Sequence, residues 1–397
     1  MLRALHLNIQ LLETAVPHDP AQELSHDWCG YEPIMRIFYD GYVYKVQSAG
    51  GINRYFANLI KRLPDHFVPL LTTCKDYVLD YPAHPNLQGF KFKPVRPLRV
   101  SSRVEKYYFR YVEAGVNYDV AHPTYYSLLT RRELAAYRRP VVLTVWDMIH
   151  ERFTNQFRDG ELVVEMKRKA IEAAQSIICI SENTKKDLLE YYPHVTQKPV
   201  RVTHLASELD ESMGYGPEMI PRRPYFLFVG ARAGYKNFSN LLTAFARVAN
   251  GHQDLTLCVV GTPFTAAEQR DIAEMKLSER VEHYGRASDT QLAKLYRQSI
   301  ALVYPSLYEG FGIPVVEAMA CGAAVIASNH ASLPEVLGSA GLLFDPAVDD
   351  LADILLSLVE NPAERERLVA LGRERAHDFS WDRTAAQTID IYHSVVD

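Results

Sequence analysis

The sequence has few cysteines, no long apolar run and no excess of basic residues, and each absence excludes a class of protein. Its five cysteines are widely spaced and include no CxxC pair, a pattern typical of reduced, mostly buried thiols in a cytosolic protein. No apolar run approaches the roughly 18 residues that span a bilayer, so we expect any membrane contact to be made from the cytosolic side. A net charge of −5 excludes the broad basic surface of a nucleic-acid-binding protein.

The first 34 residues show no sustained helical or strand period. They also lack the apolar core and the small-residue cleavage site of a signal peptide. We therefore expect residues 1–34 to form an N-terminal extension that precedes the fold. The remaining chain is long enough for two domains, since a domain usually holds about 100–200 residues.

Short apolar runs alternate with helical segments through the rest of the chain. Strands are predicted at 34–41, 67–73, 118–123, 140–147, 176–181, 225–230, 255–261, 281–285, 301–306 and 323–328. Such alternation predicts an α/β fold with parallel sheets, here two doubly wound, Rossmann-like domains that face each other across a cleft. Ligands of such folds bind at the carboxyl ends of the strands.

A stretch rich in Gly and Pro, residues 210–224, is predicted to be the linker between the two domains. The N-terminal domain would then cover 35–209 and the C-terminal domain 225–378. A final helix within 379–397 is expected to pack back on the N-terminal domain.

The stretch YEGFGIPVVEAMACG places Glu309 and Glu317 around a glycine-rich turn. Pro314 suits the first position of a helix and Gly322 the position after its end, which predicts a helix over about 314–321 with Glu317 in its first turn. The free N–H groups at the start of this helix favour an anion such as a diphosphate. The two carboxylates would then bind a ribose and a sugar ring; alternatively, Glu317 only complements the helix dipole and Glu309 is solvated.

The stretch VGARAGYKN joins a strand that ends at Gly230 to a helix that begins near Asn237. Its loop carries Arg232 and Lys236, and lysine at such a junction is a common phosphate partner. The pattern is not a P-loop, and an ordinary pair of surface cations is the alternative. Because the loop lies in the same half of the chain as Glu309, we predict that the two stretches form one site.

The run SLYEGFGIPVVEAMACGAAVIASNHASLPEVLGSAGLLFDP resembles the signature of the retaining family-four glycosyltransferases of GT-B fold, in which two glutamates are separated by seven residues. The resemblance extends in the same order over GGINRYFANLI, DVAHPTYY, VVLTVWDMIHERF, CISENTKKDLLEYY, VGARAGYKNFSNLLTAF and SDTQLAKLYRQS. It covers about residues 35–397 and is nearest to the bacterial mannosyltransferases of polysaccharide and O-antigen assembly.

The resemblance implies that the C-terminal domain holds a nucleotide sugar and the N-terminal domain the acceptor. Glu309 would face the transferred sugar and Glu317 would bind the ribose hydroxyls. The backbone N–H groups of Phe311, Gly312 and Ile313 would contact the sugar or the diphosphate.

The resemblance also assigns the charge of the leaving diphosphate to Arg232 and Lys236. A protein stabilises such a leaving group mainly through cations and helix N–H groups that are held in fixed positions. The family acts without a bound metal and no Asp-x-Asp motif is present, so we expect neither a metal site nor a cofactor beyond the nucleotide-sugar co-substrate. Further donor-binding residues implied are Gly50, Gly51, Gly230 and Arg286.

Two positions depart from the family pattern. Trp146 stands where the family often has a histidine beside the donor sugar, and an indole accepts neither a hydrogen bond nor a proton. Either Asp147 or His150 compensates, or the donor is a deoxysugar, or the indole only packs in the cleft wall. Tyr235 replaces an arginine or a proline, which weakens the phosphate role of Arg232 more than that of the neighbouring lysine.

Two further features each have two interpretations. The stretch RVSSRVEKYYFRYV (99–112) interleaves basic and aromatic residues. It would either dock on an anionic membrane near a lipid-linked acceptor or, the favoured interpretation, form a solvated helix that packs its aromatic residues inward. His122 follows a predicted strand and either lines the acceptor cleft or is structural.

We therefore predict a metal-independent retaining hexosyltransferase that acts in the cytoplasm or at the inner face of the membrane. It would move mannose from GDP-mannose to a growing polysaccharide or lipid-linked saccharide. The alternatives are a deoxysugar donor such as rhamnose, or a non-catalytic sugar-nucleotide-binding protein of the same fold, which Trp146 favours. A dinucleotide-dependent oxidoreductase is disfavoured because no GxGxxG follows any predicted strand.

Overall fold

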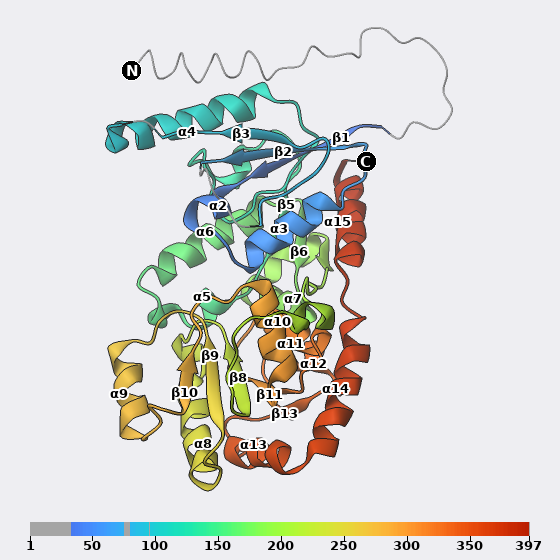
Figure 1. Ribbon diagram of the computed structural model, residues 1–397. Coiled ribbons are helices and arrows are strands. Elements are labelled where there is room, and N and C mark those ends of the chain that lie inside the picture. The colour runs from blue at the N-terminus through green and yellow to red at the C-terminus, as the bar shows by residue number, and fades with distance from the viewer. Residues whose placement is uncertain (1–32, 75–79, 95, 397) are drawn as a thin grey trace. The chain divides into compact units, whose positions relative to one another are not determined.

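The computed structural model describes residues 33–74, 80–94 and 96–396, which divide into two compact units (Figure 1). The first unit comprises the chain up to Thr144 together with Glu165–Ile177 and Thr388–Asp397, and the second comprises Val145–Val164 and Ile178–Gln387. Nearly all of the predicted extension, and Cys29 with it, lies outside the described residues. The domain boundaries drawn from the sequence stay a prediction.

The first unit contains a four-stranded parallel sheet with the order β3-β2-β1-β4. The predicted strands at 34–41 and 67–73 are confirmed as β1 and β2, which pair from Met35 with Phe67 to Asp40 with Thr72. The bounds of its elements are β1 Met35–Asp40, α2 Tyr42–Val46, α3 Gly51–Lys61, β2 Phe67–Thr73, β3 Gln88–Lys91, α4 Leu98–Gly115 and β4 Val120–Ala121.

A second, three-stranded sheet has the order β5-β6-β7, and the division between the two units falls within β5 and β6. The elements of this part of the chain are β5 Val142–Val145, α5 Ile149–Arg152, α6 Gly160–Ala173, β6 Ser176–Cys179, α7 Glu182–Tyr191 and β7 Val200–Val202.

The second unit is built on a six-stranded parallel sheet with the order β10-β9-β8-β11-β12-β13. Its strands are β8 Tyr225–Val229, β9 Thr256–Val260, β10 Val281–His283, β11 Ala301–Tyr304, β12 Val325–Ser328 and β13 Leu342–Phe344. Its helices are α8 Phe238–Gly251, α9 Ala266–Glu274, α10 Asp289–Gln298, α11 Ile313–Ala320, α12 Leu333–Leu337, α13 Leu351–Glu360, α14 Pro362–Ala376 and the start of α15 Trp381–Val396.

The chain order of this sheet reverses between two central strands. From β8 the chain proceeds outward through β9 to β10, and then crosses to β11 and proceeds outward on the other side. In doubly wound folds the loops that leave such neighbours diverge and leave a crevice for ligand. The loops after β8 and β11 are therefore the expected place of a site.

One face of this sheet is buried by α8 and α13. Phe238, Leu241 and Phe245 of α8 belong to one apolar cluster with Leu355 and Leu358 of α13 and with side chains from five of the strands. The apolar positions of α8 recur at three- and four-residue spacing, which puts them on one side of the helix. This packing fixes where α8 begins, and hence where the loop before it lies.

The predicted linker, residues 210–224, is part of the second unit. It contains a short 3-10 helix, Glu211–Tyr215. The Lys294 side chain, on α10, donates to the carbonyl oxygens of Gly216 and Glu218 at 2.7 and 2.8 Å. No helix in the described part of the chain is both long and apolar enough to cross a bilayer.

His122 lies in the interior of the first unit, so of its two interpretations the structural one is right and the one in which it lines an acceptor cleft is wrong. It is fully buried, and its Nδ1 lies 2.7 Å from the hydroxyl of Tyr392 and its Nε2 2.9 Å from that of Thr144. Burial lowers the pKa of His122 from 6.5 to about 3, because an imidazolium would be desolvated there. The neutral ring thus connects β5 to the end of α15.

This burial predicts an acid-sensitive contribution to stability. The unfolded chain takes up a proton on His122 below about pH 6.5 that the folded chain takes up only near pH 3, so stability is present above pH 6.5 and falls as the pH drops. Between about pH 7.5 and about pH 5 this residue alone should cost about 2 kcal/mol. His122→Gln should remove that share, as measured by urea unfolding at both pH values. The same change at the exposed His377 is the control; equal pH dependence of the parent and His122→Gln would contradict the assignment.

Candidate active site

Lys236 and Glu309 form an ion pair at the carboxyl end of the six-stranded sheet. The Lys236 Nζ lies 2.6 Å from Oε1 of Glu309, and the two side chains are only 14% and 9% exposed. The Tyr304 hydroxyl, at the end of β11, is 3.4 Å from the same Nζ. Lys236 follows β8 and Glu309 follows β11, so the structure brings together at the chain reversal the two residues that the sequence analysis assigned to one site.

The loop that carries Glu309 is held by its carbonyl oxygens. The buried Ser332 hydroxyl is within hydrogen-bond distance of the carbonyl oxygens of Glu309 and Phe311, at 3.0 and 2.9 Å. The hydroxyls of Ser181 and Thr184 donate to the Gly310 carbonyl at 2.7 and 3.0 Å. The carbonyl groups of three consecutive residues thus accept hydrogen bonds from serine and threonine hydroxyls. These bonds fix the backbone of the loop, and this backbone sets the position of the Glu309 side chain.

Gly310 allows this loop to lie directly against the residues that follow β5. A Cβ at this position would lie 1.9 Å from the carbonyl oxygen of Trp146 and 3.2 Å from the Cβ of Asp147. Trp146 is 7% exposed, and its carbonyl oxygen is the group that the glutamate loop approaches at Gly310. The Asp147 carboxylate accepts the N–H of Ile149 at 2.9 Å, which orients it at the start of α5.

Helix α11 begins one residue earlier than the sequence indicates. Gly312 caps it in a left-handed conformation (φ +100°), so Ile313 is the first helical residue and Pro314 the second. Gly322 follows the end of the helix with φ +74°, as predicted. The N–H of Ile313, the first helical residue, has no intrahelical partner. Pro314 carries no N–H, and the N–H of Val315 donates to the carbonyl oxygen of Gly312 at 2.9 Å.

Glu317 lies in the second turn of α11, so its predicted place in the first turn is wrong. It is 6% exposed and its Oε2 accepts a hydrogen bond from Tyr296 of α10 at 2.9 Å. Burial, with the nearby Glu317 carboxylate as a second cause, raises the pKa of Tyr296 well above its usual value. The phenol is therefore a permanent donor that orients this carboxylate.

Aromatic residues surround the Lys236–Glu309 pair. The ring of Tyr235 stacks on that of Phe153 with centroids 5.9 Å apart. Burial, followed by the negative charges of Glu309 and Asp147, raises the pKa of Tyr235 to about 12. This places Tyr235 close to both carboxylates as a neutral phenol.

Tyr308 connects the glutamate loop to two other elements. Its hydroxyl donates to Asp187 Oδ2 of α7 at 2.6 Å and accepts the Met148 N–H at 3.2 Å. Because the next residue is Glu309, these contacts help to hold the glutamate loop in place.

Arg232 lies outside this group. Its Nε is 2.7 Å from Oε1 of Glu268 on α9, and its guanidinium lies 4.6 Å from the ring centroid of Phe264. The side chain is only 3% exposed. The arginine is thus paired with a carboxylate of α9, and the cation beside Glu309 is Lys236.

The remaining predicted residues lie in four places. Gly50 and Gly51 are in the first unit, where they begin α3. His150 lies in α5 with its ring 4.5 Å from that of Phe157. Arg286 is exposed in the loop after β10. Gly230, directly after β8, has a φ of +131°, and no atom lies within 4 Å of the position that a Cβ would take there.

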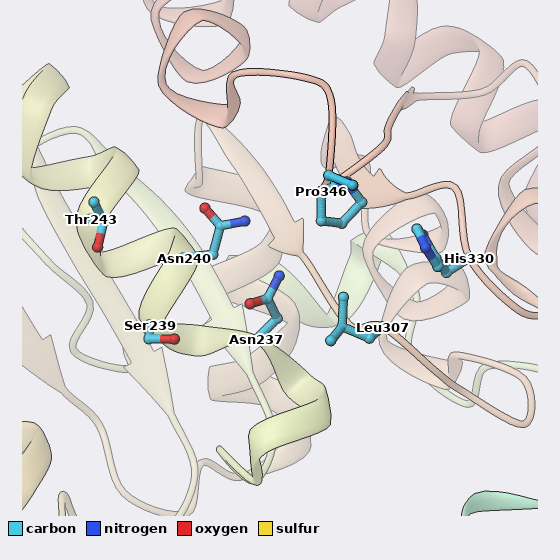
Figure 2. A pocket seen from close by; sticks show the side chains of 8 residues that line it. Asn237, Ser239, Asn240, Thr243, Leu307, His330 and Pro346 are labelled. Atoms are coloured by element: carbon cyan, nitrogen blue, oxygen red, sulfur yellow. The ribbon is translucent and has the colours of Figure 1, made fainter. Parts of the chain in front are cut away.

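An open pocket lies at the start of α8 (Figure 2). Asn237, Ser239, Asn240 and Thr243 line it from the start of α8, and Leu307, His330, Pro346 and Ala347 line it from the loops after β11, β12 and β13. Its lining mixes polar side chains with Leu307, Pro346 and Ala347 and carries no carboxylate, lysine or arginine. The Nδ1 of His330 is buried without a hydrogen-bond partner among the described residues.

Sequence reasoning missed the residues that hold the site. Ser181, Thr184 and Ser332 come from segments that are remote from Glu309 in sequence, and serines and threonines at helix starts usually cap the helix itself. Tyr308 directly precedes Glu309, and that adjacency was the one available signal.

The close approach at Gly310 predicts that Gly310→Ala is strongly destabilising. The new methyl group overlaps the Trp146 carbonyl oxygen, so the loop must shift and give up hydrogen bonds. We expect a loss of about 2–3 kcal/mol in unfolding free energy, measured by denaturant titration. Gly251→Ala is the matched control, because a Cβ there meets nothing within 4 Å; equal effects of the two changes would contradict this account.

Comparison with known proteins agrees with this geometry. The family model described as Glycosyltransferase Family 4 matches residues 49–211, and the model described as Glycosyl transferases group 1 matches residues 218–375. The O-antigen chain mannosyltransferase B of Escherichia coli is 27% identical over 300 residues, which are 72% of this chain and 74% of that protein. The alpha-maltose-1-phosphate synthase of Mycobacterium tuberculosis is 31% identical over 303 residues, 69% of this chain and 78% of that protein.

The fold is also found in solved structures. A sucrose-phosphate synthase from Thermosynechococcus elongatus superposes with a TM-score of 0.71 at 21% identity, over 91% of this chain and 98% of that one. Together the two family matches span both halves of the chain, and the chain transfers a sugar as a hexosyltransferase. It belongs to the family-four glycosyltransferases of GT-B fold and resembles their bacterial mannosyltransferases.

Proposed function

We propose that this chain is a retaining mannosyltransferase that uses GDP-mannose to extend a growing polysaccharide or lipid-linked saccharide. The observation that carries the proposal is the buried Lys236–Glu309 pair at the chain reversal of the sheet. The name of the E. coli relative, an O-antigen chain mannosyltransferase, supports mannose and a polysaccharide acceptor.

In this proposal the ion pair separates when the donor binds, and each of its two groups contacts the donor instead. The Lys236 ammonium binds the diphosphate. Glu309 accepts a hydrogen bond from a hydroxyl of the sugar and faces the positive charge that develops at the anomeric carbon. Both groups are already largely removed from water, so they need little reorganisation when charge separates, which is how preorganised sites stabilise a transition state.

The backbone supplies the rest of the charge stabilisation. The N–H groups of Gly312 and Ile313 at the start of α11 are directed at the leaving diphosphate. Glu317, oriented by Tyr296, accepts the ribose hydroxyls. We assign no direct phosphate contact to Arg232, because its guanidinium is already paired with Glu268. Lys236 and the helix start then take the part that a divalent cation plays in other transferases.

The proposal predicts that Glu309→Gln removes most of the activity while donor binding persists. The amide keeps the shape but lacks the negative charge that faces the developing cation, so kcat should fall about 100-fold or more. Release of nucleoside diphosphate measures the rate, and the thermal shift with GDP checks that the nucleotide still binds. Glu274→Gln on the exposed side of α9 is the matched control; a Glu309→Gln enzyme within about twofold of the parent would rule the role out.

The donor and the stereochemistry need a direct experiment. The full chain is tested with GDP-mannose, UDP-glucose and dTDP-rhamnose, first by thermal shift and then for transfer to mannosyl acceptors with and without EDTA. We expect a shift and turnover with GDP-mannose, an α-linked product by NMR, and no loss of rate in EDTA. Turnover with the rhamnose donor alone would favour the deoxysugar alternative, and binding without any turnover would favour a non-catalytic binding protein.

A further inference from the structure

Helix α4 of the first unit is anchored through one face. Phe109 is fully buried and packs in an apolar cluster with Cys74, Phe92 and Leu129. Val104 and Tyr108 of the same helix pack against that cluster. The position of α4 is therefore set by its inner side, and the opposite side faces outward without a role in this core.

The charges of α4 are sorted by sign between its two sides. Both of its acids are buried and paired: Glu105 forms an ion pair with Lys45, and Glu113 accepts the Tyr118 hydroxyl at 2.8 Å and lies 3.7 Å from Arg138. The bases lie on the outer side, where Arg99 and Arg103 are exposed and Lys106 and Arg110 partly exposed. The outward face of a helix in an acidic protein thus carries positive charge alone.

Two tyrosines of α4 project from this positive surface. Tyr107 and Tyr111, one helical turn apart, are 59% and 60% exposed, and Val100 on the same side is 44% exposed. The expectation that the aromatic residues pack inward is right for Phe109 and wrong for these two. Lys106 Nζ lies 5.0 Å and Arg110 Cζ 5.6 Å from the centre of the Tyr107 ring, so this exposed ring lies between two cations of the same helix.

A neighbouring loop extends the positive charge. Arg131 is exposed and donates to the carbonyl oxygen of Ser102 on α4 at 3.1 Å. The exposed Glu133 in the same loop is neutralised by Lys169, whose Nζ lies 2.8 Å away. We call this surface the α4 basic face; its members are Arg99, Val100, Arg103, Lys106, Tyr107, Arg110, Tyr111 and Arg131.

We propose that the α4 basic face docks on an anionic phospholipid bilayer. Bases beside a membrane each gain from the negative surface potential, and tyrosine places an apolar ring and a polar hydroxyl at the headgroup level. The helix would lie in the interface with its core-facing side still packed on the protein. This inference does not rest on the identity of the transferred sugar; it adds a surface that brings the enzyme to a lipid-linked acceptor.

The test is co-sedimentation of the full chain with vesicles. Phosphatidylcholine vesicles with roughly 30% phosphatidylglycerol are compared with pure phosphatidylcholine vesicles, at low salt and at about 0.5 M NaCl. We expect binding to the anionic vesicles alone, with release by salt. Arg103→Gln combined with Lys106→Gln should weaken it about tenfold or more, and Tyr107→Ser combined with Tyr111→Ser should weaken it severalfold. Circular dichroism checks that each variant remains folded.

Arg270→Gln combined with Lys276→Gln is the matched control, because it removes the same charge from exposed positions in and beside α9. Equal loss of binding in this control would show that only the net charge matters and would overturn the proposal. So would equal binding to neutral vesicles, or binding to soluble heparin that equals vesicle binding and is insensitive to the tyrosine changes. Transfer to a soluble acceptor should be unchanged in all variants, which separates this test from that of the proposed function.

Discussion

The candidate site depends on the way in which the Tyr308–Gly312 loop is fastened to its surroundings. Ser332 holds the carbonyl groups of Glu309 and Phe311, Ser181 and Thr184 hold that of Gly310, and the absence of a Cβ at Gly310 lets the backbone reach Trp146. A buried carbonyl group without a partner is costly, so the hydroxyls both satisfy the loop and select its conformation. The position of the Glu309 carboxylate follows from that backbone.

The Lys236–Glu309 pair should be regarded as a functional arrangement and not as a source of stability. Removing two charges from water costs free energy that their attraction only partly offsets. The pair is tolerated because the two groups lie at strand ends, where parallel sheets open toward ligand. A site that already holds an ammonium and a carboxylate in a partly dry environment suits a reaction that separates a diphosphate from a sugar cation.

On helix α4 the acidic and basic side chains lie on different sides of the helix. A helix with both acids paired inside and its bases outside presents a one-signed surface although the protein as a whole is acidic. In the sequence such a helix appears only as a mixture of acidic and basic residues, because Glu105 and Lys106 are adjacent in the chain. Their charges lie on different sides of the helix only once it has folded and buried Glu105. The membrane interpretation therefore gains its support from burial and not from composition.

Much of the fold was determined by the sequence itself. The alternation of apolar runs with helical segments predicted most of the parallel strands, although not β3 and β7, and it placed the beginnings of α8 and α11 to within one residue. This was possible because the pattern of buried positions within one element is local information. Gly322 after α11 and the positions of Lys236 and Glu309 after predicted strands were predictable for the same reason. The tertiary structure alone decided what depends on distant partners: that Arg232 turns to Glu268, that His122 is enclosed by Thr144 and Tyr392, and that Glu317 is oriented by Tyr296. These outcomes required the fold because a polar side chain takes its charge state and direction from the groups that replace its water, and those groups come from other parts of the chain.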